Sequence, residues 1–293
     1  MSTPISTPSG GAAVAAYLRC VGLPEGLAPN VENLVRIHRA HLDALPYENL
    51  ATMLGRPPSV DPAASLTRID QVGRAGYCFH HNGAAELVLR ALGYDVVRRH
   101  SSVYSSEEGR ASTALNHLAL EVRRLSTEGN PEGRWWFDVG LGDCLRDPAP
   151  LMPGPLTQGA FTYEITEVRP DGWSFRHDPS GSFLGLEVTG RSIDQAAVDA
   201  AHQRLTTPPD GDFTRLLVVQ RRGEQVADTV RGCLRTRVEG ADRYESELPT
   251  YDAWRDAVEQ LGLSLAGLSE PELRALHAAQ WDKHRAWTAA GRP

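Results

Sequence analysis

The hydrophobic pattern of the chain changes its period at Gly93, and this change limits the fold more than any other feature of the sequence. Before it, apolar residues recur at helical spacing in segments 13–21, 31–45 and 79–92. After it, short apolar runs separated by Gly or Asp turns follow one another with no helix between them. Consecutive strands without crossover helices imply an antiparallel sheet or barrel.

The runs that predict strands are 96–103, 118–122, 135–139, 161–168, 173–176 and 183–188. A helical pattern returns at 196–205, hairpin strands are expected at 215–219 and 225–238, and helices at 251–261 and 271–289. Residues 1 to about 12, rich in Ser, Thr, Pro and Gly, are expected to be disordered. The order predicts an α+β chain in three parts: a helical domain (1–93), a β domain (94–190) and an α/β domain (191–293).

Composition excludes several classes of partner. The chain has 293 residues, of which 41% are apolar and 23% charged, as is ordinary for a globular protein. A net charge of −7 argues against nucleic acid, so local arginines or backbone amides must hold any anionic ligand. No apolar run reaches the length of a membrane span, and the N-terminus lacks the pattern of a signal peptide. We therefore expect a cytoplasmic protein without a membrane partner; the oligomeric state is open.

The four cysteines, Cys20, Cys78, Cys144 and Cys233, are far apart and form no CxxC pair. This excludes the usual zinc spacings and a disulfide framework. Cys78 differs from the others because it follows a glycine-aromatic turn and opens a predicted helix of about 14 residues. Unpaired N–H groups and the helix dipole at such a position favour a thiolate and can stabilise an oxyanion. The alternative is a buried structural cysteine.

A base and its orienting partner are available elsewhere in the sequence. His117, in ALNHLALEV, begins a predicted strand, and Asp138, in RWWFDVGLGD, follows three aromatic residues in a buried strand. A buried aspartate is costly unless it is paired, and a thiol nucleophile needs a base that a third group orients. Each residue alone is typical of a structural role. Together, Cys78, His117 and Asp138 predict a catalytic triad.

The stretches LPYENL, RAGYCFHHN, NHLAL and FDVGLG stand in an order and at spacings that resemble the arylamine N-acetyltransferase family. The similarity is clear from about residue 17 to residue 151 and fainter beyond. It implies a helical bundle carrying the cysteine, an antiparallel β-barrel carrying His117 and Asp138, and an α/β lid. The core of that fold is shared with papain-like and transglutaminase-like enzymes.

The resemblance also implies the chemistry. Cys78 matches the nucleophile, His117 the base and Asp138 its orienter in a two-step, ping-pong transfer through an acetyl-cysteine. The donor would be acetyl-CoA and the acceptor an arylamine or hydrazine, with coenzyme A released and no metal required. Gly140 and Gly142 match the loop that meets acetyl-CoA.

Other matched residues have structural roles in the family. By this resemblance Arg74 braces the fold near the site, and Glu48 and Asn49 are structural.

The sequence departs from the family pattern at several positions. Ala75 replaces a glycine, and His80 replaces a glutamate. Leu141 stands where an aromatic ring normally helps to shape the acceptor pocket, which bears on acceptor preference. Asp143, close by, is expected to favour cationic amines or to disfavour a CoA phosphate. Gly211, flanked by two aspartates, replaces a common serine and weakens the transfer of CoA contacts from that segment.

Alternative sites and functions are less well supported. His38 and His41 have a spacing that suggests a metal, but packing explains them more simply. Three residues on the last helix, Trp281, His284 and Trp287, fit either packing or a cover over the acceptor cleft. The rival functions are a macrolactam-forming amide synthase of the same superfamily, a cysteine hydrolase, and a non-catalytic binding protein.

Overall fold

The structure is a computed structural model that describes residues 10–191, 193–209 and 211–292. Its N-terminal third contains helices α1 (Gly10–Cys20), α2 (Val31–Ala44), α3 (Leu50–Met53), α4 (Pro62–Val72) and α5 (Cys78–Ala91). Helix α1 begins at Gly10, so the expectation of disorder is wrong for residues 10–12; residues 1–9 lie outside the described residues. Good helix formers such as Ala12 and Ala13 extend the helix backwards.

Helix α4 was not expected, although the sequence carries its end signals. The Asp61 side chain accepts a hydrogen bond from the Ala64 N–H, Pro62 occupies the first turn, and Gly73 ends the helix with φ 65°. A capping aspartate, an N-terminal proline and a left-handed glycine are typical helix boundaries.

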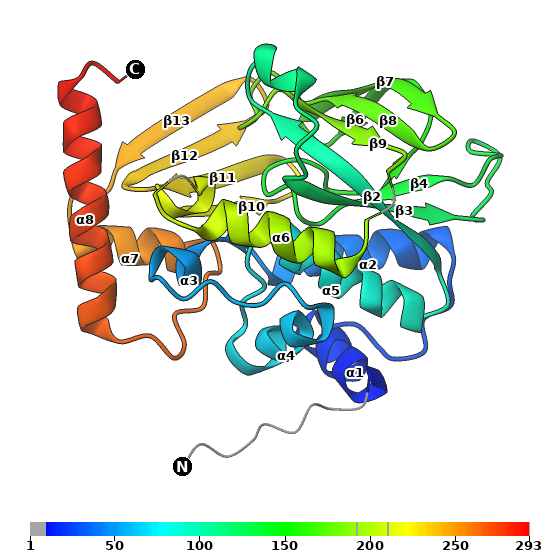
Figure 1. Ribbon diagram of the computed structural model, residues 1–293, viewed down its shortest axis with the longest axis horizontal. Helices are drawn as coiled ribbons and strands as arrows, with labels where there is room; N and C mark the ends of the chain where they lie inside the picture. Colours follow the sequence, from blue (N-terminus) through cyan, green and yellow to red (C-terminus); the bar gives the residue numbers. More distant parts are fainter. Residues whose placement is uncertain (1–9, 192, 210, 293) are drawn as a thin grey trace.

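The middle of the chain forms an eight-stranded antiparallel sheet that curls into a nearly closed barrel (Figure 1). The strand order is β5-β4-β3-β2-β9-β8-β7-β6. The bounds are β2 (Asp95–Tyr104), β3 (His117–Arg123), β4 (Trp135–Phe137), β5 (Ala149–Pro150), β6 (Gly154–Gln158), β7 (Phe161–Arg169), β8 (Gly172–Arg176) and β9 (Gly185–Thr189), with a short 3-10 helix, η1 (Glu108–Ala111), after β2. The α+β class and the antiparallel barrel are confirmed.

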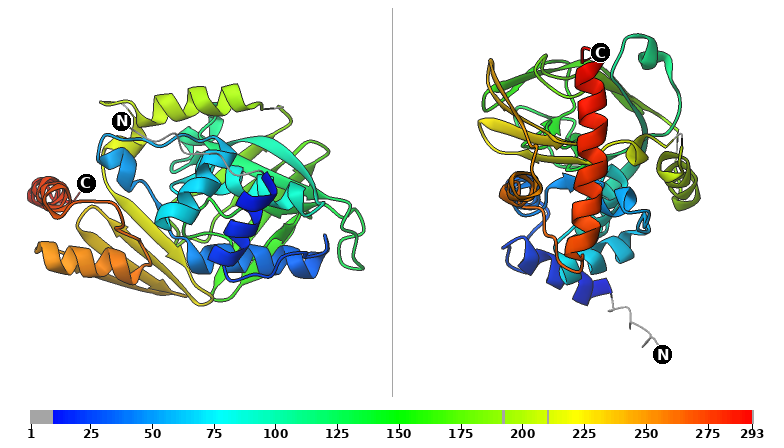
Figure 2. Two further views of the ribbon diagram at one scale, coloured as in Figure 1. Left: turned by 90° about the horizontal axis from the view of Figure 1, so that it is seen from below. Right: turned by 90° about the vertical axis from the view of Figure 1, so that its left-hand side faces the viewer.

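The last part of the chain forms a second antiparallel sheet, of order β1-β10-β11-β12-β13. Its strands are β1 (Tyr47–Glu48), β10 (Val218–Arg222), β11 (Val226–Arg231), β12 (Leu234–Glu239) and β13 (Asp242–Glu247). Helix α6 (Gln195–Thr206) and the 3-10 turn η2 (Asp212–Thr214) precede it, and α7 (Tyr251–Gln260) and α8 (Glu270–Ala289) follow. Figures 1 and 2 show α7 and α8 together at one end of the molecule.

Each face of this second sheet has a different environment. The face with Val219 and Val230 packs against Trp254 of α7 and Leu273 of α8. The opposite face borders a cavity. Strand β1 comes from the part of the chain predicted to be helical, so the three-part division by residue number stays a prediction. Within the described ranges 10–191, 193–209 and 211–292, no helix is both long and apolar enough to cross a membrane.

Candidate active site

Cys78 is the first residue of α5, as the sequence predicts, and is 3% exposed on the cavity wall. The turn before it requires glycine, because Gly76 has φ 118° and a Cβ there would lie 2.6 Å from His80 Nδ1. The Tyr77 N–H donates to the same Nδ1 at 3.3 Å, while His80 Nε2 donates to the Pro58 carbonyl at 3.1 Å. His80 therefore caps the helix from its third position, as a glutamate would.

His117 and Asp138 meet in the barrel beside α5. His117 Nε2 lies 2.7 Å from Asp138 Oδ2, and both side chains are almost completely buried. Three further groups donate to the same carboxylate: the Trp136 indole at 3.0 Å, the Asn82 amide at 2.7 Å and the Gly140 N–H at 3.1 Å. A buried carboxylate with donors on both oxygens can remain ionised.

The charge state of His117 follows from these neighbours. Burial lowers its pKa, but the Asp138 charge and the hydrogen-bonded Cys78 outweigh burial and raise the pKa to about 10. The Cys78 thiol also lies 3.6 Å from the Asn116 carbonyl oxygen. A protonated imidazole beside a thiol favours the reactive thiolate form. The three residues predicted from the sequence are thus brought together.

His38 supports the aspartate from behind. Its Nε2 lies 3.0 Å from the Asp138 carbonyl oxygen and its Nδ1 lies 2.9 Å from the Arg146 carbonyl oxygen. Burial lowers the pKa of His38 to about 4, although Asp147 and other neighbours oppose this. His41 turns elsewhere, toward His81. Among the described residues, no group of His, Cys, Asp and Glu side chains is arranged to hold a metal ion.

The two glycines predicted to meet acetyl-CoA are needed for packing. A Cβ on Gly140 would lie 2.8 Å from the Cys78 Cα, and one on Gly142, which has φ 63°, would lie 2.1 Å from Gln220 Oε1. Glycine at these positions lets the loop after Asp138 approach both the nucleophile helix and β10. Contact of this loop with acetyl-CoA stays a prediction.

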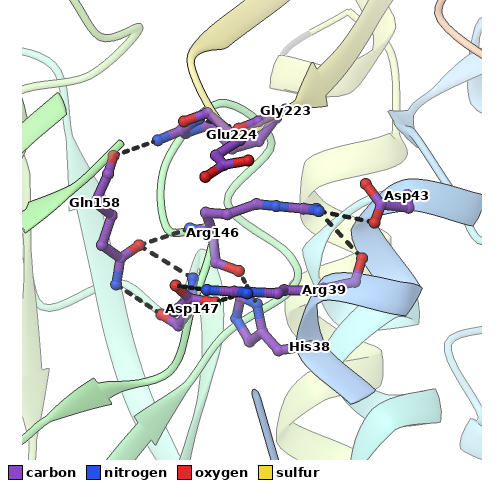
Figure 3. A network of polar contacts seen from close by, with 9 residues as sticks. His38, Arg39, Asp43, Arg146, Asp147, Gln158, Gly223 and Glu224 are labelled. Atoms are coloured by element: carbon purple, nitrogen blue, oxygen red, sulfur yellow. Dashed lines mark hydrogen bonds and ion pairs between the residues drawn. The ribbon is translucent and has the colours of Figure 1, made fainter. Parts of the chain in front are cut away.

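Ion pairs fix the far end of the same loop to α2 (Figure 3). Arg39 pairs with Asp147 through two nitrogens, one at 2.8 Å, and Arg146 pairs with Asp43 at 2.7 Å. Gln158 Oε1 accepts the N–H groups of Arg146 at 2.7 Å and Asp147 at 3.1 Å. The loop that carries Gly140 and Gly142 is therefore held at both ends.

Asp143 does not present a free charge, contrary to expectation. Its carboxylate accepts the Ser182 N–H and the Ser182 hydroxyl, both at 2.8 Å. Burial raises its pKa, but the nearby His177 and the hydrogen bonds from Ser182 outweigh this and hold the pKa below its usual value. The negative charge is compensated inside the protein, so it cannot act on ligands as an isolated charge.

The cavity beside Cys78 has a volume of about 850 Å³ and reaches from the triad to the second sheet. One sheet face contributes alternate residues, which are Val218, Gln220, Ala227, Thr229, Arg231, Leu234, Thr236, Val238, Arg243 and Glu245. Arg243 pairs with Glu245 at 3.0 Å, whereas Arg231 has no ion-pair partner among the described residues. Trp287 of α8 also reaches the cavity wall. This volume is typical of small-molecule sites.

The remaining family-matched residues tie the parts of the chain together. Arg74 donates to the Ser264 carbonyl at 2.7 Å, which braces the connection between α7 and α8. Asn49 accepts the Val218 N–H at 2.8 Å, and Glu48 accepts the N–H at the start of α3 at 2.6 Å. These contacts are structural, as the resemblance implies.

Sequence reasoning missed Asn82, Trp136 and His38 as partners of Asp138. A signal existed for Asn82, because it lies four residues after Cys78 and so on the same helix face. Trp136 was noted only as part of an aromatic run, and no local pattern links His38 to a residue 100 positions away.

Comparison with known proteins gives a consistent family. A sequence model described as N-acetyltransferase matches residues 30–265. The chain is 32% identical over 145 residues to an arylamine N-acetyltransferase of Mycolicibacterium smegmatis, covering 48% of this chain and 51% of that protein. It is 34% identical over 207 residues to the arylamine N-acetyltransferase of Mycobacterium bovis, covering 68% and 70%. The chain spans about half the length of several of these relatives, including the first of the two above.

Solved structures show the same fold. The M. smegmatis arylamine N-acetyltransferase superposes with a TM-score of 0.81 at 25% identity, covering 92% of this chain and 98% of that one. A Mycobacterium marinum arylamine N-acetyltransferase solved in complex with CoA has a TM-score of 0.78 at 23% identity, covering 90% of this chain and 98% of that one, and supports the fold alone. Proansamycin X synthase of Amycolatopsis mediterranei is 28% identical over 161 residues, covering 53% of this chain and 58% of that protein.

Proposed function

The chain belongs to the arylamine N-acetyltransferase family, and we propose that it transfers an acetyl group from acetyl-coenzyme A to the nitrogen of an aromatic amine or hydrazine. The observation that carries this proposal is the Cys78 thiol at the first residue of a helix, in contact with a His117 that Asp138 orients, on the wall of a cavity of about 850 Å³. Four free thiols also support a reducing, cytoplasmic setting.

In the first step, the Cys78 thiolate attacks the thioester carbonyl of acetyl-CoA. The oxyanion that forms is stabilised by the N–H groups of Cys78 and Phe79 at the start of α5, because the next two N–H groups of the helix already donate to the Tyr77 carbonyl. The C–S bond to coenzyme A then breaks, and the His117 imidazolium gives its proton to the departing thiolate. The products are acetyl-Cys78, coenzyme A thiol and a neutral His117.

In the second step, the acceptor nitrogen attacks the acetyl-Cys78 carbonyl. The neutral His117 takes the proton that the nitrogen loses, and the C–S bond to Cys78 breaks. The cysteine leaves as a thiolate beside a reprotonated His117, so the starting charge state returns. Because one histidine donates in the first step and accepts in the second, its orientation by Asp138 matters to both.

The cavity is large enough for donor and acceptor to be bound in turn, as a ping-pong reaction requires. Its arginine-bearing end, with Arg231 on β11, is suited to the phosphates of coenzyme A, because the rest of the surface is acidic on balance. We place the acceptor at the other end, beside Leu141 and the triad.

Mass spectrometry after incubation with acetyl-CoA tests the proposal directly. We expect an acetyl group on Cys78 and release of one equivalent of coenzyme A before any amine is added. A following screen of amines, read by further release of coenzyme A, identifies the acceptor. Absence of an acetyl adduct on Cys78 in the folded protein would overturn the proposal.

A macrolactam-forming amide synthase is the second candidate, favoured by the similarity to proansamycin X synthase and by Leu141 in place of a ring. Such an enzyme would load a polyketide acyl group on Cys78 and release it to an internal amine. Selective loading from a long-chain thioester, with little loading from acetyl-CoA, would favour this function.

A further inference from the structure

A second buried group of ionisable side chains lies beside the cavity, apart from the proposed triad. It consists of Asp143 and Cys144, in the loop after β4, and His177, after β8. His177 Nε2 lies 3.7 Å from Asp143 Oδ1, and the side chains of the two residues are 0% and 7% exposed. The acetyl transfer proposed above uses none of these groups.

The surroundings make His177 and Asp143 an ion pair. Burial lowers the pKa of His177, but Cys144 and Asp143 outweigh burial and raise the pKa well above its ordinary value. His177 Nδ1 donates to the Asp178 carbonyl at 3.1 Å, so a protonated ring has an acceptor facing each nitrogen. Two further titratable groups face His177: the Tyr163 phenol, whose ring stands edge-on at 5.4 Å, and the Asp178 carboxylate, whose pKa is lowered partly by His177.

This ion pair holds the loop 178–183, which connects β8 to β9. Asp143 accepts both the N–H and the hydroxyl of Ser182 at 2.8 Å. A Cβ on Gly181 would lie 2.1 Å from the His177 ring, so the loop backbone rests directly on the imidazole. The loop therefore has its position set by two buried charges.

The next residue of the loop carries a phenyl ring into the cavity. The Phe183 ring packs edge-to-face on His177, with centroids 4.4 Å apart and planes at 86°. Phe183 is half-buried and lines the cavity together with Leu141, Gly140 and Cys78. Ser182, which precedes it, accepts from Gln220 at 3.3 Å, the residue that also fills the space beside Gly142.

We propose that Phe183 forms the aromatic wall of the acceptor site and that the Asp143–His177 ion pair positions it there. The inference rests on the proposed function, because it assigns the acceptor to this end of the cavity. A phenyl ring packed edge-to-face on His177 has at least one face free of that contact, and this face can stack on a planar acceptor. Leu141, at the position where an aromatic wall is expected, then serves as an aliphatic surface. Asp143 and His177 are positioning residues.

Replacing Phe183 tests the wall. The measurement is the ratio of kcat/KM for aniline to kcat/KM for methylhydrazine, a non-aromatic acceptor. Both acceptors share the first half-reaction, so the ratio reports the acceptor alone. Phe183→Leu should lower this ratio by about 2- to 10-fold, which corresponds to one lost aromatic contact. The neighbouring Leu184→Ala is the matched control and should leave the ratio unchanged.

A ring returned to position 141 should rescue the preference. In Leu141→Phe/Phe183→Leu the ratio should rise again toward the wild-type value. If Phe183→Leu leaves the ratio unchanged, or if Leu184→Ala lowers it as much, the proposal is overturned.

The pH dependence of the same ratio tests the positioning role of Asp143 and His177. In the wild type the ratio should be constant between pH 6 and 8, because Asp143 keeps His177 protonated. Asp143→Asn removes that charge and leaves burial to lower the pKa of His177, so the ring should lose its proton and the ratio should fall below the wild-type ratio. A ratio in Asp143→Asn that equals the wild-type ratio at every pH contradicts the positioning role.

Measuring aniline binding without catalysis distinguishes failure of this inference from failure of the proposed function. In a Cys78→Ala background, calorimetry should show that Phe183→Leu weakens aniline binding by about 2- to 10-fold. If wild-type Cys78 takes no acetyl group but this binding still weakens, acetyl transfer is wrong and the aromatic wall stands. Equal aniline affinity with and without Phe183 overturns the wall.

Discussion

His41 Nε2 and His81 Nδ1 lie 2.6 Å apart, with both rings completely buried. Tyr17 donates its hydroxyl proton to His41 Nδ1 at 2.8 Å, and His81 Nε2 donates to the Gly76 carbonyl at 2.9 Å. A carbonyl can only accept, and this fixes the direction of each hydrogen bond from Tyr17 to Gly76. Both histidines are neutral, and each carries its proton on Nε2. This series of hydrogen bonds ends at Gly76, in the turn that precedes the helix of the nucleophile.

These histidines predict a loss of stability in acid. Burial lowers the pKa of His81 to about 4, and burial together with the neighbouring His81 lowers that of His41 well below its ordinary value. Below the ordinary value of about 6.5, the unfolded chain binds protons that the folded chain does not. Each histidine should therefore reduce the free energy of unfolding by about 1.4 kcal/mol per pH unit as pH falls from about 6.5 toward 4. Urea titrations across this range measure the slope.

Tyr17→Phe tests the hydrogen bonds that link Tyr17, His41 and His81. It leaves His41 Nδ1 buried without its donor and should cost about 1–3 kcal/mol at pH 7.5. The cost should be the same at pH 5, because burial keeps His41 neutral in both proteins. Tyr94→Phe removes a hydroxyl that donates to the Asn30 carbonyl at 2.9 Å and is the matched control. A Tyr17→Phe cost that changes between pH 7.5 and pH 5 would contradict the neutral state assigned to His41.

Loss of the nucleophile should separate activity from stability. Cys78→Ala should abolish acetyl transfer with little change in the melting temperature, because the thiol faces a cavity. Cys233→Ala, in the core under α7 and α8, should keep activity and lose stability. Turnover assays and circular dichroism measure both. Substantial activity in Cys78→Ala would end the proposed chemistry.

Asp138→Asn should be nearly as harmful to the reaction. An amide nitrogen would face donors from Trp136, Asn82 and His117, so the imidazole would lose its orientation. We expect the rate of Cys78 acetylation to fall by roughly 10³–10⁴, as in other triads that lose the carboxylate. Stopped-flow release of coenzyme A gives this rate, and Asp147→Asn at the other end of the loop is the control. Comparable rates in the two variants would exclude the orienting role.

Alkylation should distinguish Cys78 from the other thiols. Burial raises the pKa of Cys20 and Cys144, and raises that of Cys233 to about 12. Only the thiolate reacts readily, so exposed Cys20 should label slowly at pH 7 while Cys78 labels first. Peptide mass spectrometry after brief iodoacetamide treatment gives the order. Prior loading with acetyl-CoA should protect Cys78 alone, and equal labelling of Cys20 and Cys78 would contradict the prediction.

Arg231 should bind the donor. Arg231→Gln should raise KM for acetyl-CoA by about 5-fold, the effect of losing one exposed charged contact of about 1 kcal/mol. The effect should diminish at high salt. Arg237→Gln, on a strand position that points away from the cavity, is the control. If the two variants have equal KM values, the phosphates bind elsewhere.

Helices and strands with a clear apolar period were predictable from the sequence, and elements without one were not. Helix α5 has the predicted start and length because Gly76 and Gly93 bound it. Strand β13 was missed because all six of its residues are exposed, so no alternation of apolar and polar residues marks it. Strand β1 was missed because it has only two residues and pairs with β10, which lies far along the chain.

The triad was predictable for a different reason: its members sit at the ends of recognisable elements and match a family pattern. The residues around it depend on long-range contacts that no local pattern encodes. Asp143 looked like a free charge in the sequence, because the histidine and serine that neutralise it come more than thirty positions later. The His41–His81 contact joins two helices in the same way.

Strand β1 has a consequence for how the enzyme is made. Tyr47 and Glu48 pair with Gln220 and Val219 on one side, and the Glu48 N–H donates to the Gly76 carbonyl at 2.7 Å on the other. A nascent chain emerging from the ribosome lacks β10 until the barrel has been synthesised, so the segment that steadies the nucleophile turn waits for its partner. We therefore expect the Cys78 thiol to react slowly in stalled chains that end before β10. It should become reactive only after the final third of the chain has been translated.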